Sequence, residues 1–223
     1  MLKKLIKKIF LHFNSPLEAL FYDYRKVYWL YSKFYLTKLM KVEFPKSSFL
    51  INIDYIDLLN LWKNIIKRKP KIIVEIGSGY STFLIIAAIN KINKKNDEKI
   101  KFYSVEQNND YLNDLKKLMT KSIIDSVEFI ITDLKIININ DVPVSVCTNF
   151  PQEKINFLYE DRADHPEYSI AGDAVKIENE MPNDFFICVD GMKDSVNFYK
   201  KNLKRKYNVV ESKFCGTNFI PIQ

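Results

Sequence analysis

The chain has 223 residues, of which 47% are hydrophobic and 27% are charged. This length suits one domain with a complete core, or one domain with a small appendage, and the composition excludes an intrinsically disordered chain. The formal net charge is +7, and residues 1–50 carry all of it, with ten basic and three acidic residues. The neutral remainder argues against a nucleic-acid-binding protein that is basic throughout. Residues 1–50 can still form a local basic surface that binds phosphate, a membrane or an acidic partner.

The three cysteines and two histidines are widely spaced, without a CxxC pair or a Cys/His cluster. A Cys/His zinc site is therefore not expected, and the odd number of cysteines favours a reducing cytosol. The first residues, MLKKLIKKIF, resemble the charged start of a signal peptide, but no clean apolar stretch or cleavage site follows. No run reaches 18 apolar residues. The sequence thus predicts a cytoplasmic protein without a membrane span.

Residues 1–50 predict a basic, aromatic-rich helical appendage. Apolar residues within 2–13 recur at helical spacing with lysines on the other side, which predicts a basic amphipathic helix. Asn14-Ser15-Pro16 ends this helix, and a second, aromatic helix is expected to about residue 40. Its aromatic face can pack on the main domain, or it can also contact lipid or a membrane-bound acceptor. In the second interpretation, residues 1–13 contact the inner face of the membrane.

Residues 51–223 alternate between helical and strand patterns and predict one α/β domain. Helices are expected at 53–68, 81–92, 110–121, 169–180 and 195–206, and strands at 71–77, 101–106, 127–133, 155–161, 184–190, 207–214 and 217–222. We count five strands followed by helices, with a variable stretch after the third strand through about residue 153, and then a closing pair of strands. This order predicts a Rossmann-like, doubly wound, mostly parallel sheet of seven strands with helices on both faces.

The turn after the first predicted strand, in VEIGSGYST (residues 74–82), is the most informative segment. Gly77 and Gly79 permit unusual backbone angles and the close approach of a ligand. The following helix offers free N–H groups and a positive dipole end, and Ser81 or Thr82 can cap it or bind the ligand. The pattern is typical of a site for a nucleoside-containing cofactor. The third glycine of the dinucleotide-binding fingerprint is absent.

The segment EIGSG resembles motif I of the class I S-adenosylmethionine (SAM)-dependent methyltransferases. The resemblance covers about residues 52–223. It is strengthened by acidic residues at or near the ends of five successive strands, namely Glu75, Glu106, Asp133, Asp161 and Asp190. A sulfonium cation suits a pocket edged by carboxylates, whereas they would repel a pyrophosphate. The resemblance implies a cofactor site in which the glycine turn lines the methionine half, Glu75 orients the amino group, Glu106 holds the ribose and Asp133 holds the adenine amine. The turn residues of this site are Gly77, Ser78, Gly79, Tyr80 and Ser81.

The acceptor side is expected after the fourth strand, where Asp161 and His165 would lie beside the transferred methyl group. His165 is a candidate general base, and the alternative is a histidine in a surface loop. Small-molecule O-methyltransferases resembling catechol methyltransferase place magnesium at the strand ends that here carry Asp161 and Asp190. Gly191 stands where those enzymes usually have a further Asp or Asn, so the sequence leaves magnesium open.

We predict a SAM-dependent methyltransferase that acts on an oxygen atom of a small molecule or a glycan intermediate. The absence of an N-P-P-Y motif disfavours methylation of an amino group. One alternative is a nucleic-acid methyltransferase, disfavoured by the neutral main domain. The other is a non-enzymatic Rossmann-like domain that binds a membrane or a partner through residues 1–50. The sequence does not indicate the acceptor or the oligomeric state.

Overall fold

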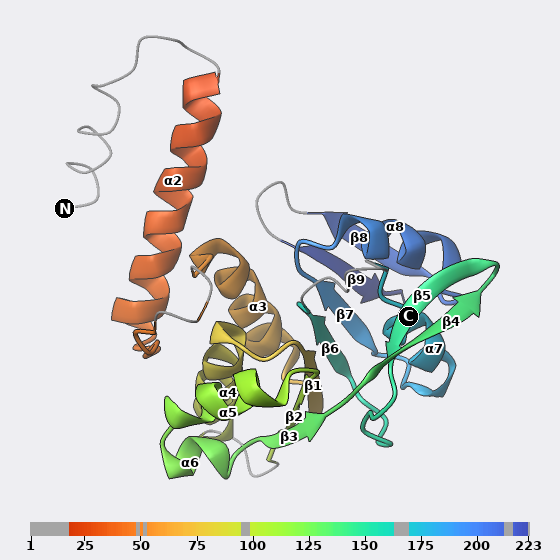
Figure 1. Ribbon diagram of the computed structural model, residues 1–223. Coiled ribbons are helices and arrows are strands. Elements are labelled where there is room, and N and C mark those ends of the chain that lie inside the picture. Colours follow the sequence, from red (N-terminus) through yellow and green to blue (C-terminus); the bar gives the residue numbers. More distant parts are fainter. Residues whose placement is uncertain are drawn as a thin grey trace.

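A seven-stranded sheet forms the centre of the fold (Figure 1). The computed structural model describes residues 18–47, 50, 53–94, 99–162, 170–211 and 216–222. The strands of the sheet are β1 (Ile72–Ile76), β2 (Lys101–Glu106), β3 (Glu128–Ile131), β6 (Phe157–Glu160), β7 (Phe186–Val189), β8 (Tyr207–Glu211) and β9 (Thr217–Pro221). Their order is β3-β2-β1-β6-β7-β9-β8. Six of these strands run in the same direction, and β9 runs in the opposite direction. The predicted Rossmann-like, mostly parallel sheet of seven strands is confirmed.

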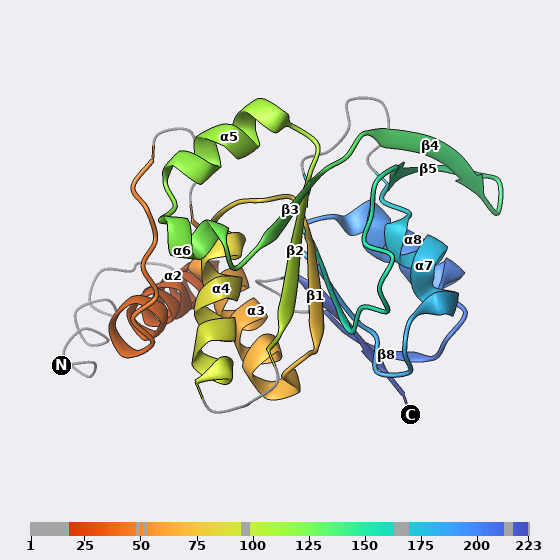
Figure 2. The ribbon, with the colours of Figure 1, turned by 90° about the horizontal axis from the view of Figure 1, so that it is seen from below.

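Helices cover both faces of this sheet, as predicted (Figure 2). They are α3 (Tyr55–Arg68), α4 (Tyr80–Asn93), α5 (Asn109–Lys117), α6 (Lys121–Ile124), α7 (Asp173–Ile177) and α8 (Lys193–Asn202). Alternate residues of a strand point to opposite faces. Ile73 and Phe157 therefore pack with α3 and α4 on one face, whereas Leu158 and Ile187 pack with α7 and α8 on the other.

The segment after β3 is a hairpin, so the expected helix after the third strand is wrong. Strands β4 (Leu134–Ile139) and β5 (Val142–Cys147) pair antiparallel. Asn140 and Asp141 both have positive φ angles, which a tight hairpin turn requires and which these residue types tolerate. Val144 and Val146 bury the hairpin in the core on the α7 and α8 face. The hairpin thus covers a part of the sheet that a helix was expected to cover.

Three predicted helices are shorter in the structure because other hydrogen bonds replace their own. The predicted helix 110–121 ends early as α5, and Thr120 caps a separate short helix, α6. The predicted helix 169–180 is reduced to α7 and a 3₁₀ turn, η3 (Glu178–Glu180). Helix α8 ends at Asn202, and the N–H groups of Lys204 and Arg205 donate to the Glu178 carboxylate at 2.7 and 3.0 Å.

The described part of the N-terminal segment is a helix that packs on α3. Helix α2 (Glu18–Phe34) continues into the π-helical turn η2 (Tyr35–Leu39). Trp29 meets Tyr55 of α3 edge to face, with 5.1 Å between ring centroids, and Leu36 lies fully buried in the core formed by α3 and α4. Figure 1 shows the N-terminal half of α2 extending beyond α3. The predicted helix at 2–13 lies outside the described residues.

Leu36 and Leu39 test whether η2 belongs to the folded core. Leu36 is fully buried and Leu39 is 53% exposed. Leu36→Ala should lower the free energy of unfolding by about 2–5 kcal/mol, because it leaves a cavity among packed side chains. Leu39→Ala should change it by less than about 0.5 kcal/mol. Urea unfolding followed by circular dichroism measures both, and equal effects would show that η2 does not fold with the core.

Candidate functional site

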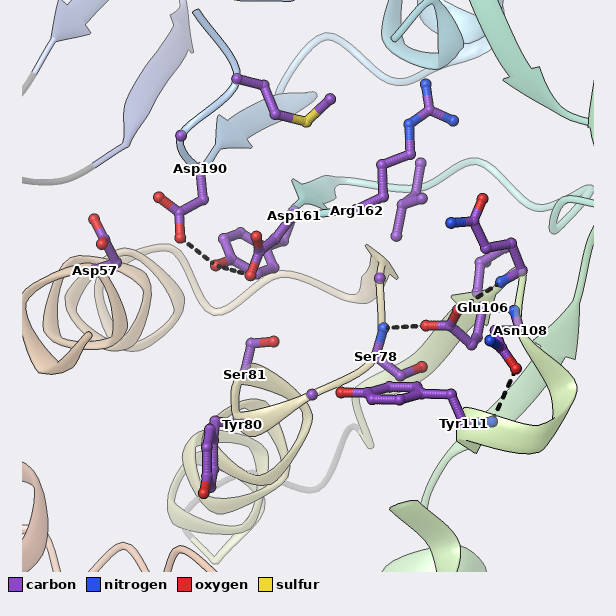
Figure 3. A pocket seen from close by; sticks show the side chains of 18 of the residues that line it. Asp57, Ser78, Tyr80, Ser81, Glu106, Asn108, Tyr111, Asp161, Arg162 and Asp190 are labelled. Atoms are coloured by element: carbon purple, nitrogen blue, oxygen red, sulfur yellow. Dashed lines mark hydrogen bonds between the residues drawn. The ribbon is translucent and has the colours of Figure 1, made fainter. Parts of the chain in front are cut away.

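A cavity of about 610 Å³ opens at the carboxyl ends of the parallel strands (Figure 3). Its walls come from the glycine turn after β1, the ends of β2, β6 and β7, and the first turn of α3. The cavity is lined by eight of the residues predicted for the site: Gly77, Ser78, Gly79, Tyr80, Ser81, Glu106, Asp161 and Asp190. The fold therefore brings the predicted cofactor side and acceptor side to one cavity, as expected for an open α/β sheet.

The turn after β1 is held tightly against the end of β6. Gly77 has a φ angle of +93°, and its N–H donates to the Val105 carbonyl at 2.9 Å. A Cβ atom at Gly77 would lie 2.1 Å from the Asp161 carbonyl oxygen. Glycine meets both conditions because it lacks a Cβ atom. Gly79 is extended instead, and a Cβ atom there would meet the Tyr111 hydroxyl at an ordinary 3.7 Å.

Glu106 joins the two loops on the predicted ribose side. Its Oε2 accepts a hydrogen bond from the Ser78 N–H at 3.0 Å. Its Oε1 accepts from the N–H groups of Gln107 and Asn108, both at 2.9 Å. A carboxylate has about four lone-pair sites, so Oε2 keeps capacity for a further donor from the cavity. The side chain is thus held in place before any ligand binds.

Glu75 lies below the glycine turn and is not among the residues that line the cavity. It is fully buried, and its Oε2 accepts from the Thr82 hydroxyl at 2.7 Å and the Ser104 hydroxyl at 2.8 Å. The Thr82 oxygen in turn accepts from the Gly79 N–H at 3.0 Å. Burial, with a smaller effect of the Glu106 charge, raises the pKa of Glu75 to about 7. Glu75 thereby ties the first turn of α4 to β2 beneath the cavity.

Three carboxyl groups gather on the opposite side of the cavity. The Tyr159 hydroxyl lies 3.3 Å from Asp161 Oδ2 and 3.3 Å from Asp190 Oδ2. Asp57, in the first turn of α3, lies beside Asp190 (Figure 3). Burial, followed by the charges of Asp190 and Asp54, raises the pKa of Asp57 to about 8.

The two strand-end carboxyls also bind protons more tightly than usual. Burial raises the pKa of Asp190 to about 6. Loss of hydration, and then the negative charges of Asp190 and Glu75, raise the pKa of Asp161 well above its usual value. This side of the cavity therefore favours a proton, or another positive charge, near its carboxylates.

Asp161 and Asp190, the predicted magnesium ligands, lie together but do not form a complete set of ligands. The described residues contain no group of three or more His, Cys, Asp or Glu side chains placed to hold a metal ion. Magnesium prefers an octahedral shell of oxygen atoms. Here a hydrogen-bond donor, the Tyr159 hydroxyl, contacts both carboxylates. The ligands that these described residues offer do not fit magnesium. Magnesium binding therefore stays a prediction from the resemblance.

A buried ion network anchors the segment that carries Asp161. Arg162 donates to the Ser145 carbonyl at 2.8 Å, and its guanidinium lies 3.1 Å from Asp173 and 3.6 Å from Glu160. The Tyr199 hydroxyl donates to Glu160. Although Arg162 lines part of the cavity, its charge is neutralised by these two carboxylates. The network connects β6 with the hairpin, α7 and α8.

Two further predicted site residues, Tyr80 and Asp133, lie away from the centre of the cavity. Tyr80 lines it, but its ring points away from Asp161 (Figure 3) and meets Phe44 edge to face at 6.0 Å. Asp133 lies in an adjoining hollow, whose other walls include residues that also line the cavity. His165 lies outside the described residues.

Sequence reasoning missed Asp57, Tyr111 and Tyr159, all of which line the cavity. Tyr159 had a readable signal, because it precedes Asp161 by two positions and must share its face of the strand. Asp57 had none, because its place in the wall depends on how α3 packs against the sheet. Tyr111 comes from α5, and its ring lies beside Ser78 (Figure 3).

Gly77 and Gly79 form a matched pair for testing the steric constraint. Gly77→Ala should lower the free energy of unfolding by more than about 3 kcal/mol, because it combines a strained φ angle with a clash against backbone. Gly79→Ala should change stability by less than about 1 kcal/mol. Thermal and urea unfolding measure both variants. Equal stability of the two would contradict the contact between Gly77 and Asp161.

Glu75 should make stability depend on pH. Its pKa is about 7 in the folded protein and about 4.5 in the unfolded chain, so ionisation favours unfolding as the pH rises through this interval. Relative to Glu75→Gln, the wild type should lose about 3 kcal/mol of stability between pH 4.5 and 7, and no more above it. Unfolding of both proteins across this range measures the difference. A constant difference would refute the raised pKa.

No model of a protein family matches this chain, and no curated protein sequence matches it. The solved structures that are similar to it include three methyltransferases with TM-scores above 0.5. The methyltransferase PaMTH1 of Podospora anserina, bound to S-adenosylhomocysteine (SAH), has a TM-score of 0.58 at 13% identity, over 96% of this chain and 100% of that chain. An O-methyltransferase from Bacillus cereus in complex with SAH has a TM-score of 0.53 at 11% identity, over 89% and 100%. A methyltransferase from Geobacter sulfurreducens has 0.52 at 10% identity, over 78% and 81%. The chain therefore has the Rossmann-like fold of the class I methyltransferases.

Proposed function

We propose that this chain is a SAM-dependent methyltransferase that methylates an oxygen atom of a small molecule or a glycan intermediate. The observation that carries the proposal is the cavity between the glycine turn and Glu106, at the carboxyl edge of a methyltransferase-type sheet. The Podospora anserina and Bacillus cereus proteins with this fold were solved with SAH bound. Ligands of open α/β sheets bind at this edge.

The cofactor side of the cavity has groups that suit SAM. The absence of a side chain at Gly77 lets the turn sit against the Asp161 carbonyl, and the backbone of the turn and Ser81 line the same wall of the cavity. Glu106 is positioned to accept a hydrogen bond from a ribose hydroxyl through Oε2. The hollow that contains Asp133 adjoins this side and would receive the adenine. When bound, SAM supplies an electrophilic methyl group and leaves as SAH.

The acceptor side supports a neutral or positively charged acceptor. Among the described residues that line the cavity, five are acidic and one, Arg162, is basic. That cation is already paired with Glu160 and Asp173. A nucleic-acid acceptor would bring phosphates to this wall, where uncompensated carboxylates repel them. The charge therefore favours a small molecule or glycan over nucleic acid.

Asp161 is the described residue best placed to take the acceptor's proton. It lines the cavity at the end of β6, next to the glycine turn, and its raised pKa makes it a better base than an ordinary carboxylate. As the acceptor oxygen bonds to the methyl carbon, its O–H bond breaks and the proton passes to the base. His165 is the second candidate for this role. Magnesium at Asp161 and Asp190 remains a prediction from the resemblance alone.

The proposal includes a cytoplasmic location. The helices in the described ranges are too short or too polar to cross a membrane. Peripheral contact of residues 1–13 at the inner face of the membrane is part of the same prediction.

Calorimetric titration with SAM and SAH tests the proposal. Both should bind the folded wild type, and Glu106→Gln should weaken binding roughly 10–100-fold, because it removes a charged hydrogen-bond acceptor. Glu128→Gln is the matched control, because it makes the same substitution at an exposed position on the neighbouring strand β3. Circular dichroism verifies that each variant is folded.

The absence of binding at millimolar SAM would refute a SAM-dependent enzyme. It would favour instead a Rossmann-like domain that acts through residues 1–50. Equal binding by Glu106→Gln and the wild type would leave the enzyme standing but remove Glu106 from the ribose site.

A further inference from the structure

We propose that the outward face of α2 and η2 is a docking surface for an anionic lipid bilayer. This face, called here the α2 face, carries Tyr24, Tyr31, Phe34 and Leu39. The four make up more than half of the seven large hydrophobic side chains that are exposed in the described residues. Phe34 and Leu39 are 52% and 53% exposed, so the helix presents real apolar surface to its surroundings.

The α2 face points away from the body of the protein because the other side of the helix is fixed. Trp29 packs against Tyr55, and Leu36 is buried in the core. Ser32 is fully buried on the same side. Figures 1 and 2 show α2 at the edge of the molecule, beside α3. A flat membrane surface can therefore reach the helix without displacing any packed element of the described residues.

Positive charge dominates this face. Residues 24–42 contain five basic residues and no acidic residue, and the two acidic residues of α2, Glu18 and Asp23, precede this stretch. Lys26, Lys33 and Lys38 are exposed, and Lys38 follows Phe34 by one helical turn. Lysines attract anionic headgroups, while tyrosine and phenylalanine rings settle at the boundary between headgroups and acyl chains. This combination is typical of a helix that lies in the membrane interface.

The same charge pattern disfavours a second copy of the chain as the occupant. In a symmetric dimer the α2 face would meet itself, and the four basic residues of α2 and η2 would meet only two acidic residues, Glu18 and Asp23, from each copy. Like charges that face each other across an interface are unfavourable. An anionic bilayer supplies the missing negative charge and also covers the exposed rings.

Docking here would bring the membrane close to one rim of the cavity. Arg25 of α2 forms an ion pair with Asp54 at 2.9 Å, and Asp54 both caps α3 and lines the cavity. The surface proposal stands independently of methyl transfer, because its test measures lipid binding alone.

The test is sedimentation of the full chain with phosphatidylcholine vesicles, with or without phosphatidylglycerol. We expect binding only to the anionic vesicles, and weaker binding as salt is raised. The double variant Lys26→Glu with Lys38→Glu should lower the partition coefficient by more than about tenfold. The double variant Phe34→Ser with Leu39→Ser should lower it roughly tenfold, since it removes the rings and side chains that enter the interface.

A matched control changes the same charge elsewhere. Lys201, in the last turn of α8, and Lys206, after this helix, are both exposed. The double variant Lys201→Glu with Lys206→Glu therefore changes the net charge by the same amount as the lysine variant of α2. It should bind the anionic vesicles within about threefold of the wild type. Thermal unfolding verifies that all variants fold.

Wild-type binding by both α2 variants would overturn the proposal, because the lipid contact would then lie outside the α2 face. A dimer in light scattering that the Phe34 and Leu39 variant dissociates would also overturn it, and would make the face a subunit interface. Equal loss of binding in the α8 control would reduce the effect to net charge and overturn it as well.

Discussion

The contact between the Gly77 backbone and the Asp161 carbonyl sets the geometry of the cavity. β1 and β6 are parallel neighbours, with Ile76 beside Glu160, so their ends reach the same edge of the sheet. Only a hydrogen atom fits between the turn and the carbonyl. The glycine turn and the acidic wall are consequently fixed at one distance from each other, as the proposed transfer of a group between two bound molecules would require.

This edge concentrates carboxyl groups that the fold compensates unequally. Glu106 accepts three backbone N–H groups, and Glu75 accepts two hydroxyls. Asp57, Asp161 and Asp190 share little more than the Tyr159 hydroxyl and the Gly216 N–H. The least compensated carboxyls therefore lie on the acceptor side, where a proton or a cationic group can relieve their repulsion. Glu106, with its three N–H donors, is the best compensated of these carboxyls and supports the proposed cofactor side.

Most of the sheet and half of the site could be predicted because their signals are local. Short apolar runs mark the strands, and Gly77, Glu106 and Asp161 stand where strands end. The hairpin after β3 could not be predicted from this pattern, since its place depends on a core it shares with α7 and α8. Asp57 enters the cavity only through the packing of α3. The reason that Gly77 must be glycine also lies in another strand.

The pairing of β1 with β6 has a consequence for the order of assembly. The Ile72 N–H donates a hydrogen bond to the Asn156 side-chain oxygen, 84 residues later in the chain. By contrast, α2 and α3, which are in contact, are consecutive helices in the sequence. Closing so long a loop is entropically costly, and non-local pairings form slowly. We expect the helical layer and the first two strands to organise first. The wall that joins the two halves of the cavity then forms last, so a nascent chain acquires its binding site only when almost all of it is available to fold.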